Sequence, residues 1–151
     1  MCSSDLAHPR RPQDPYGLCK VACEEIARSY TEKCGMETVL LRPPWVVSPE
    51  ELDALRASRG RRPEKFALFH YIDARDAAVA FRKAVERPLP GCTVLFAGSG
   101  ESLVDEPLCD VYPRLMPAIG DKAKALTGTQ GPVSVERAKE LLDWKPVHSW
   151  R

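Results

Sequence analysis

The 151-residue sequence lacks the features that would assign it to a membrane, nucleic-acid or metal-binding class. No apolar run approaches the ~20 residues that a transmembrane helix needs, and no signal peptide is visible. The 22 Lys and Arg residues nearly balance the 21 Asp and Glu residues, and the net charge of +1 predicts neither a nucleic-acid surface nor an acidic tail. No Cys-x-x-Cys pair or His/Cys cluster has zinc spacing, so we expect no metal site, no membrane partner and no nucleic-acid partner.

A glycine-rich dinucleotide-binding turn is also absent. Gly98-Ser99-Gly100 follows an apolar segment, but Leu103 occupies the place where a dinucleotide fingerprint has its third glycine. We therefore do not assign Gly98 or Gly100 to a cofactor.

The six cysteines show no pattern of a disulfide framework, and we expect reduced thiols in a cytoplasmic protein. Cys19 and Cys23 are one helical turn apart, and we expect them to pack rather than to bind a ligand.

What is present is the composition of one globular domain, with 44% apolar and 28% charged residues. Apolar periodicity and turn signals predict an alternation of helices and strands. Helices are expected over 16–34, 49–58, 73–87, 106–116 (cut by Pro113) and 134–142, and strands over 37–42, 66–72 and 92–97.

Local signals fix several of these ends. Gly35 is a plausible stop for the first helix, and Ser48-Pro49-Glu50-Glu51 is a capping-box pattern that opens the second. Asp73 and Ser134 are expected N-caps of the third and last helices. We expect the third helix to bury a face made of Ala77, Ala78, Phe81 and Val85.

Tyr16 and Lys20 are the residues with the clearest chemical potential. They are four residues apart in a segment of helical periodicity, so they should share one helix face. A phenol with a pKa of ~10 shuttles protons poorly at neutral pH. A nearby ammonium favours the phenolate, which makes the tyrosine a usable acid–base catalyst. A surface tyrosine and a surface lysine would show the same spacing, so this alternative stays open.

The residues around this pair resemble the extended short-chain dehydrogenase/reductase family, the NAD-dependent epimerase/dehydratases. That family has a Pro-Tyr-Gly-x-Ser-Lys run followed by a glutamate, and this sequence has Pro15-Tyr16-Gly17-Leu18-Cys19-Lys20 followed by Glu24-Glu25. Cys19 replaces the usual serine. The resemblance implies that Tyr16 is the catalytic acid–base and that Lys20 also holds the nicotinamide ribose of NAD or NADP.

The resemblance continues beyond the first strand. Arg42-Pro43-Pro44-Trp45-Val46-Val47-Ser48-Pro49 is similar to the family's Leu-Arg-x-x-Asn-Val-Tyr-Gly-Pro region, with Trp45 in the asparagine slot. The resemblance implies that Pro43, Pro44 and Trp45 contact the nicotinamide end of the cofactor, and that Trp45 also contacts substrate. A core or rim aromatic is the alternative for Trp45.

Arginines around Gly60 are a further candidate for substrate binding. Arg61 and Arg62 could bind a phosphate group, although a charged surface loop is the alternative. We expect the substrate pocket to lie between the Trp45 loop, residues 59–62 and the 98–106 loop, because open α/β sheets bind ligands beyond the carboxyl ends of their strands.

The extent of the resemblance predicts the domain organisation. Asp143-Trp144-Lys145-Pro146 is similar to the family's Leu-Gly-Trp-x-Pro ending, with Asp143 in the glycine slot. Residues 14–151 are therefore expected to be the C-terminal half of such an enzyme. The expected fold class is α/β, the C-terminal part of a Rossmann-like doubly wound sheet plus a small mixed substrate-binding lobe. Residues 1–13 are expected to be disordered or artefactual, because codons for residues 2–6 can match a sequencing adapter.

The function that the resemblance implies is an NAD(P)-dependent epimerase, dehydratase or oxidoreductase acting on a sugar or nucleotide sugar. The 151-residue chain alone is expected to be inactive, since the pyrophosphate-binding turn is missing. An open sheet edge also predicts self-association, for example as a homodimer. The alternative is a non-catalytic binding or assembly module that retains only the substrate lobe.

Overall fold

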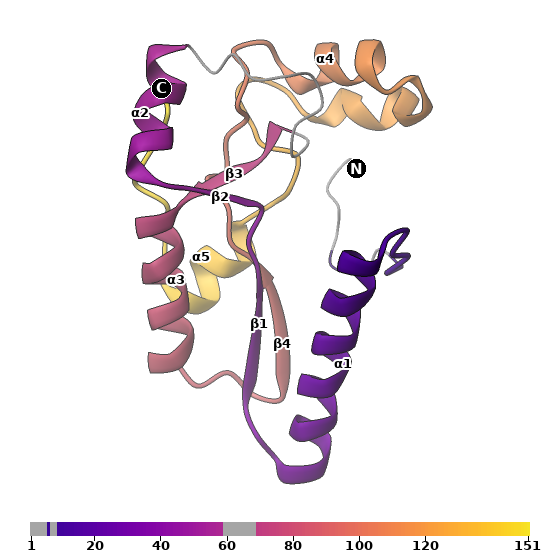
Figure 1. Ribbon diagram of the computed structural model, residues 1–151, viewed down its shortest axis with the longest axis vertical. Coiled ribbons are helices and arrows are strands. Elements are labelled where there is room, and N and C mark those ends of the chain that lie inside the picture. The colour runs from indigo at the N-terminus through magenta and orange to yellow at the C-terminus, as the bar shows by residue number, and fades with distance from the viewer. Residues whose placement is uncertain (1–5, 7–8, 59–68) are drawn as a thin grey trace.

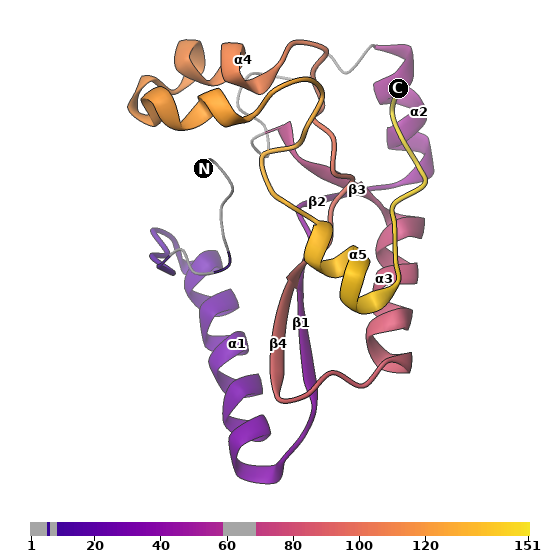
Figure 2. The same cartoon turned by 180° about the vertical axis from the view of Figure 1, so that it is seen from behind.

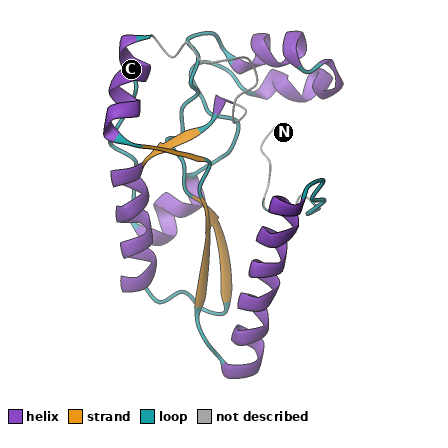
Figure 3. Cartoon of the chain, in the orientation of Figure 1, coloured by secondary structure: helices purple, strands orange, loops and turns teal. Residues whose placement is uncertain are grey.

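The computed structural model describes residues 6, 9–58 and 69–151. Helices alternate with short strands along the described chain (Figure 1; Figure 3). The elements are α1 (Pro15–Cys34), β1 (Thr38–Arg42), β2 (Trp45–Val47), α2 (Pro49–Ala57), β3 (Tyr71–Asp73), α3 (Ala74–Glu86), β4 (Cys92–Phe96), α4 (Leu108–Leu115), the 3₁₀ segment η2 (Pro117–Ala125) and α5 (Glu136–Leu142).

Both sheets are parallel and have two strands within the described residues. β1 pairs with β4 from Thr38↔Cys92 to Arg42↔Phe96, and β2 pairs with β3 from Trp45↔Tyr71 to Val47↔Asp73. Parallel pairing requires long crossovers, and here helices supply them. α1 lies on one side of the β1–β4 pair, with α3 and α5 on the other side (Figure 1; Figure 2). The predicted α/β fold with parallel strands is confirmed.

Local capping residues form the helix ends, as predicted for Gly35, Ser48 and Asp73. The Asp14 side chain accepts the N–H of Gly17 at 2.6 Å, and Gly35 ends α1 in the left-handed region at φ 66°. Ser48 and Glu51 form the complete capping box of α2. Asp73 caps α3 by accepting the N–H of Arg75 at 2.8 Å. Asp143 ends α5 at φ 47°, where a glycine would avoid steric cost.

Buried side chains form two cores. One joins β2, β3, α2, α4 and the C-terminus, and contains Tyr71, Leu52, Leu108 and Trp150 among others. The other joins α3, β4 and α5, and contains Ile72, Ala80, Leu95 and Trp144 among others. α1 contributes no buried residue to either core. The two cores therefore form without buried side chains from α1.

Four sequence predictions about these elements are wrong in detail. α3 buries Asp76, Ala77 and Ala80, so only Ala77 of the predicted face is buried. Ala78 is exposed, Phe81 is 50% exposed and Val85 is 88% exposed. The buried face of α3 includes Asp76 in place of an apolar residue, so the apolar periodicity predicted the wrong face of the helix. Pro113 lies inside α4 and does not cut the helix. The strand predicted over 66–72 is β3, which ends at Asp73, and its first predicted residues, 66–68, lie outside the described residues. The expected N-cap of the last helix is also shifted, because Val135 is the cap and Ser134 accepts only the N–H of Glu136 at 3.4 Å.

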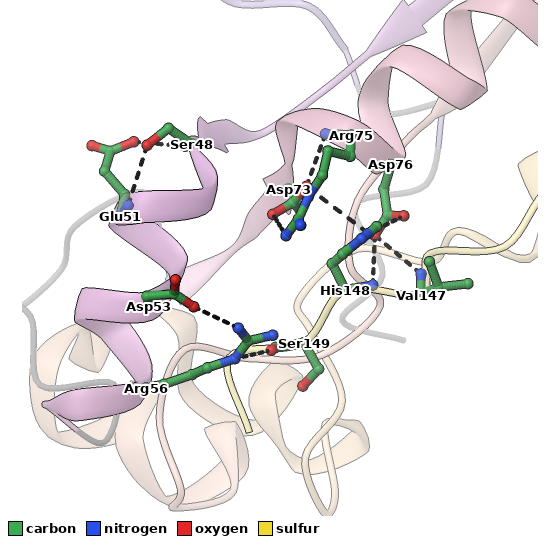
Figure 4. Close-up of polar contacts among 10 residues, drawn as sticks. All are labelled: Ser48, Glu51, Asp53, Arg56, Asp73, Arg75, Asp76, Val147, His148 and Ser149. Atoms are coloured by element: carbon green, nitrogen blue, oxygen red, sulfur yellow. Dashed lines mark hydrogen bonds and ion pairs between the residues drawn. The ribbon is translucent and has the colours of Figure 1, made fainter.

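The C-terminal tail (residues 144–151) is fastened to α3 by one buried carboxylate. Asp76 accepts the backbone N–H groups of Val147 and His148 at 3.0 and 2.9 Å, and its other oxygen lies 2.8 Å from His148 Nδ1 (Figure 4). Trp144 donates its indole N–H to the backbone carbonyl of Asp76 at 3.1 Å. Asp76 therefore serves a structural role.

The end of the tail is inserted into the first core. Trp150 is buried, its backbone N–H reaches the Tyr71 hydroxyl at 3.1 Å, and its indole N–H donates to the Ser102 carbonyl at 2.8 Å. Arg56 of α2 donates to the Ser149 carbonyl at 2.9 Å (Figure 4). Residues far apart in sequence thus hold the tail against the first core.

Candidate active site

Tyr16 and Lys20 lie on one face of the first two turns of α1, as their spacing predicts. The Lys20 Nζ lies 5.1 Å from the centroid of the Tyr16 ring, and the Tyr16 side chain is 73% exposed. Along the long axis of the molecule, the start of α1 lies at about the same height as the end of β1 (Figure 1; Figure 2). The cation and the phenol are therefore adjacent to each other and accessible to solvent.

An ion pair holds α1 against the end of β1. Arg42 donates to both carboxylate oxygens of Glu24 at 2.7 Å, and its guanidinium lies 5.8 Å from the centroid of the Phe96 ring. The two hydrogen bonds from Arg42 hold the pKa of Glu24 below its ordinary value of 4.5. Thr31 and Thr38 add a hydroxyl hydrogen bond of 2.8 Å farther along the same interface. The Glu24–Arg42 pair thus positions the helix that carries Tyr16 and Lys20.

Weakening this pair is expected to change the acid stability of the fold. Because the pKa of Glu24 is lower in the folded state, its stabilisation is present above pH 4.5 and disappears as the pH falls through the lowered pKa. Glu24→Gln should cost about 1 kcal/mol at neutral pH, since the pair is partly exposed, and should flatten the stability profile below pH ~4.5. Urea unfolding across this pH range measures both effects.

Glu25→Gln is the matched control, because Glu25 is the next residue and its side chain is 52% exposed in its ion pair with Arg10. An exposed ion pair contributes little to stability, so this variant should follow the wild-type profile. Equal losses in both variants would show that the Glu24–Arg42 pair has no special part in holding α1.

An open cleft of about 540 Å³ lies beside this interface. The N-terminal segment, α1 and the end of β1 line it, with Leu6, Pro9, Arg10, Val21, Glu25, Arg28 and Arg42. Its arginines are already engaged with Glu24 and Glu25. Its three arginines thus share two glutamates, which leaves one excess positive charge.

The other residues predicted to contact cofactor or substrate lie in different parts of the chain. Pro43 and Pro44 connect β1 to β2, and Trp45 opens β2, where it is half-buried against the first core. Two of the three segments expected around the pocket flank β3: Trp45 pairs with Tyr71, and Ser99 donates its N–H to the Tyr71 carbonyl at 2.8 Å. Arg61 and Arg62 lie outside the described residues.

The Gly98-Ser99-Gly100 segment has a packing role that the sequence did not reveal. A Cβ on Gly98 would collide with the His70 ring, so glycine leaves the room that this buried histidine needs. Burial lowers the pKa of His70 to about 4, and its Nε2 has no hydrogen-bond partner among the described residues. Gly100 adopts φ 77°, which favours glycine.

Beside His70, a polar cluster links β3 to the tail. The Tyr71 hydroxyl donates to Glu101, and burial raises the pKa of Tyr71 above its ordinary value. Glu101 also accepts the Ser149 hydroxyl at 2.7 Å and pairs with Arg151 at 3.3 Å. Because its members satisfy one another, we interpret this cluster as structural.

A second cleft, of about 290 Å³, lies next to Gly100. It is lined by Gly100, Ala125, Leu126, residues 130–136 and Lys139. Within the described residues, no group of three or more His, Cys, Asp or Glu side chains could hold a metal ion.

Comparison with known families matches residues 3–94, which include α1, β1 and β2, to the NAD dependent epimerase/dehydratase family. The chain belongs to this family. Among curated proteins of similar sequence, the L-arabinose 1-dehydrogenase (NAD(P)(+)) of Haloferax volcanii is 29% identical over 90 residues, which are 56% of this chain and 33% of that protein.

Solved structures share the fold. The UDP-N-acetylglucosamine 4-epimerase of Bacillus cereus is 21% identical with a TM-score of 0.59, and the match covers 93% of this chain and 50% of that one. The dTDP-glucose 4,6-dehydratase of Bacillus anthracis, solved with NAD, is 18% identical with a TM-score of 0.58 over 94% of this chain and 50% of that one. The chain thus spans about half the length of these epimerase/dehydratase structures. No helix in the described ranges is long and apolar enough to cross a membrane.

Proposed function

We propose that this chain supplies the catalytic helix and the substrate-binding lobe of an NAD(P)-dependent epimerase, dehydratase or dehydrogenase that acts on a sugar or a sugar nucleotide. The observation that carries the proposal is the Tyr16–Lys20 pair, which lies within the family match and has the ammonium 5.1 Å from the phenol ring. Sugar-directed chemistry is supported by the names of the relatives, which act on arabinose, UDP-N-acetylglucosamine and dTDP-glucose.

Tyr16 has the role of acid–base catalyst in this proposal. Its hydroxyl exchanges a proton with the substrate hydroxyl that is oxidised or with the carbonyl that is reduced. The Lys20 ammonium favours the phenolate form of a neighbouring tyrosine by Coulomb attraction. The Glu24–Arg42 pair maintains the helix that presents both groups.

The cofactor fits this chain at one end only. NAD or NADP would supply hydride transfer, with its nicotinamide side held by Lys20 and the Pro43–Trp45 connection. The Pro43–Trp45 connection follows the carboxyl end of β1, where open α/β sheets bind ligands, and Lys20 lies in α1. The sequence has no Gly-x-x-Gly-x-x-Gly turn for the pyrophosphate. We infer that a further glycine-rich half must complete the site.

The proposal is tested on an extended protein, in which a glycine-rich half precedes this chain. The upstream reading frame of the source genome, or the first half of the Bacillus cereus epimerase, can supply that half. The assay follows NAD(P) reduction and product formation with free aldoses and with UDP- and dTDP-sugars. Turnover of any one of these substrate classes supports the proposed enzyme. Cofactor binding without turnover of any of them would favour the alternative, a non-catalytic binding module.

Lys20→Ala is expected to weaken cofactor binding and turnover together in the extended protein. Loss of one charge-assisted hydrogen bond to the ribose should raise Kd about tenfold, which corresponds to 1.4 kcal/mol. Loss of the neighbouring cation should also lower kcat, because the phenolate is no longer favoured. Lys33→Ala, in the last turn of the same helix, is the control and should change neither. A Lys20→Ala effect confined to protein stability would contradict the dual role.

A further inference from the structure

Cys19 and Cys23 form an exposed pair of thiols, contrary to the expectation that they pack. Both are free and exposed on α1, the helix that contributes nothing to either core. With Tyr16, Ile26 and Tyr30 they follow a stripe in which neighbours are three or four residues apart, and those three side chains are also more than half exposed.

Their spacing excludes a disulfide between Cys19 and Cys23. Residues four apart on a helix have Cβ atoms about 5–6 Å apart, whereas a disulfide requires about 3.5–4.5 Å. The two thiols therefore cannot join in a disulfide while α1 keeps its helical backbone from Pro15 to Cys34. Rotation about each χ1 can still direct both sulfurs toward one atom placed between successive turns.

We propose that Cys19 and Cys23 form a two-thiol site for soft, thiophilic ligands, of which a trivalent organoarsenical is the probe. Sulfur ligands of this kind select soft partners over hard cations. In the reaction with an aryl-arsenous acid, two S–H bonds and two As–OH bonds break, two As–S bonds form and two waters leave. No electrons are exchanged, so no oxidant or reductant is needed. The site does not depend on the proposed enzymatic function.

The described chain brings no other thiol close enough on α1 to form an equivalent site. Cys34 lies eleven residues after Cys23, which places it about 16 Å farther along the helix axis. Cys92 and Cys109 are partly buried in β4 and α4. The i and i+4 pair is therefore the place where α1 can chelate one ligand atom.

The test is intact-mass spectrometry of the reduced 151-residue chain after treatment with phenylarsine oxide and a wash with a monothiol. The expected product carries one arsenical that survives the monothiol and is released by a dithiol. The affinity of two linked thiols for one arsenic atom exceeds the affinity of a single thiol by about 10²-fold or more. Cys19→Ser and Cys23→Ser should therefore each lower the affinity for the arsenical by about that factor.

Cys34→Ser is the matched control, since it removes an exposed thiol from the same helix and should keep the adduct. Far-UV circular dichroism of each variant confirms that the helical content is unchanged, because each residue is exposed. An adduct that survives in Cys19→Ser and Cys23→Ser, or that disappears in Cys34→Ser, would overturn the proposal. The absence of any wash-resistant adduct on the wild-type chain would overturn it as well.

Discussion

Tyr16→Phe is expected to lower the turnover of the extended protein by about 10²–10⁴-fold, the usual contribution of a positioned acid–base group. The substitution removes one hydroxyl from a side chain at the exposed start of α1, so folding should be unaffected. The cofactor should still bind, because Lys20 remains. Steady-state kinetics at saturating cofactor measure kcat, and fluorescence titration measures cofactor affinity.

Tyr30→Phe provides the control for this prediction. Tyr30 lies on the same helix, is 53% exposed, and lies 14 residues beyond Tyr16. Loss of its hydroxyl should leave kcat within about twofold, because Tyr30 lies about 21 Å along the helix axis from Tyr16. The free energy of unfolding should change by no more than ~0.5 kcal/mol, as is typical of surface substitutions. Wild-type turnover in Tyr16→Phe, or an equal loss in Tyr30→Phe, would remove Tyr16 from the proposed catalytic role.

Trp150→Ala is expected to destabilise the fold by about 3–5 kcal/mol, the range for deletion of a large buried aromatic side chain. Trp150 is only 4% exposed, and its removal also leaves the Ser102 carbonyl without its indole donor. Small domains have a total stability of about 5–15 kcal/mol, so this one change near the chain end removes a large part of it. Urea unfolding followed by circular dichroism measures the loss.

Val147→Ala separates the effect of Trp150 from a general effect of changing the tail. Val147 is 66% exposed, and its backbone N–H, which Asp76 accepts, is retained in the alanine variant. This variant should lie within about 0.5 kcal/mol of wild type. Similar losses in the two variants would mean that Trp150 does not anchor the tail in the core.

Features set by neighbouring residues were predictable from the sequence. The bounds of α1, its Gly35 stop and the capping box of α2 each depend on side chains within one turn of the backbone they affect. The shared face of Tyr16 and Lys20 follows from helix geometry in the same way. The expectation of parallel strands followed from the family resemblance rather than from any local signal, and the pairing of β1 with β4 was not predicted.

Features that depend on distant residues were not predictable. Arg56 meets Ser149 across 93 positions, and Asp76 meets His148 across 72, and neither contact leaves a periodic signal. The buried stripe of α3 was misjudged because it includes Asp76, whose burial makes sense only once the tail supplies its hydrogen-bond donors. The role of Gly98 likewise required knowing that the His70 ring lies against it.

We propose that this chain brings Tyr16 and Lys20 to a cofactor that another half holds. Calorimetric titration of NAD and NADP into the isolated chain and into the extended protein tests it most directly. Loss of several charge-assisted hydrogen bonds, at about 1.5–3 kcal/mol each, should leave the isolated chain with millimolar affinity or weaker. The extended protein should bind one of the two cofactors with a Kd of about a micromolar. A Kd below about 100 μM for the isolated chain, well under the millimolar scale, would contradict the account.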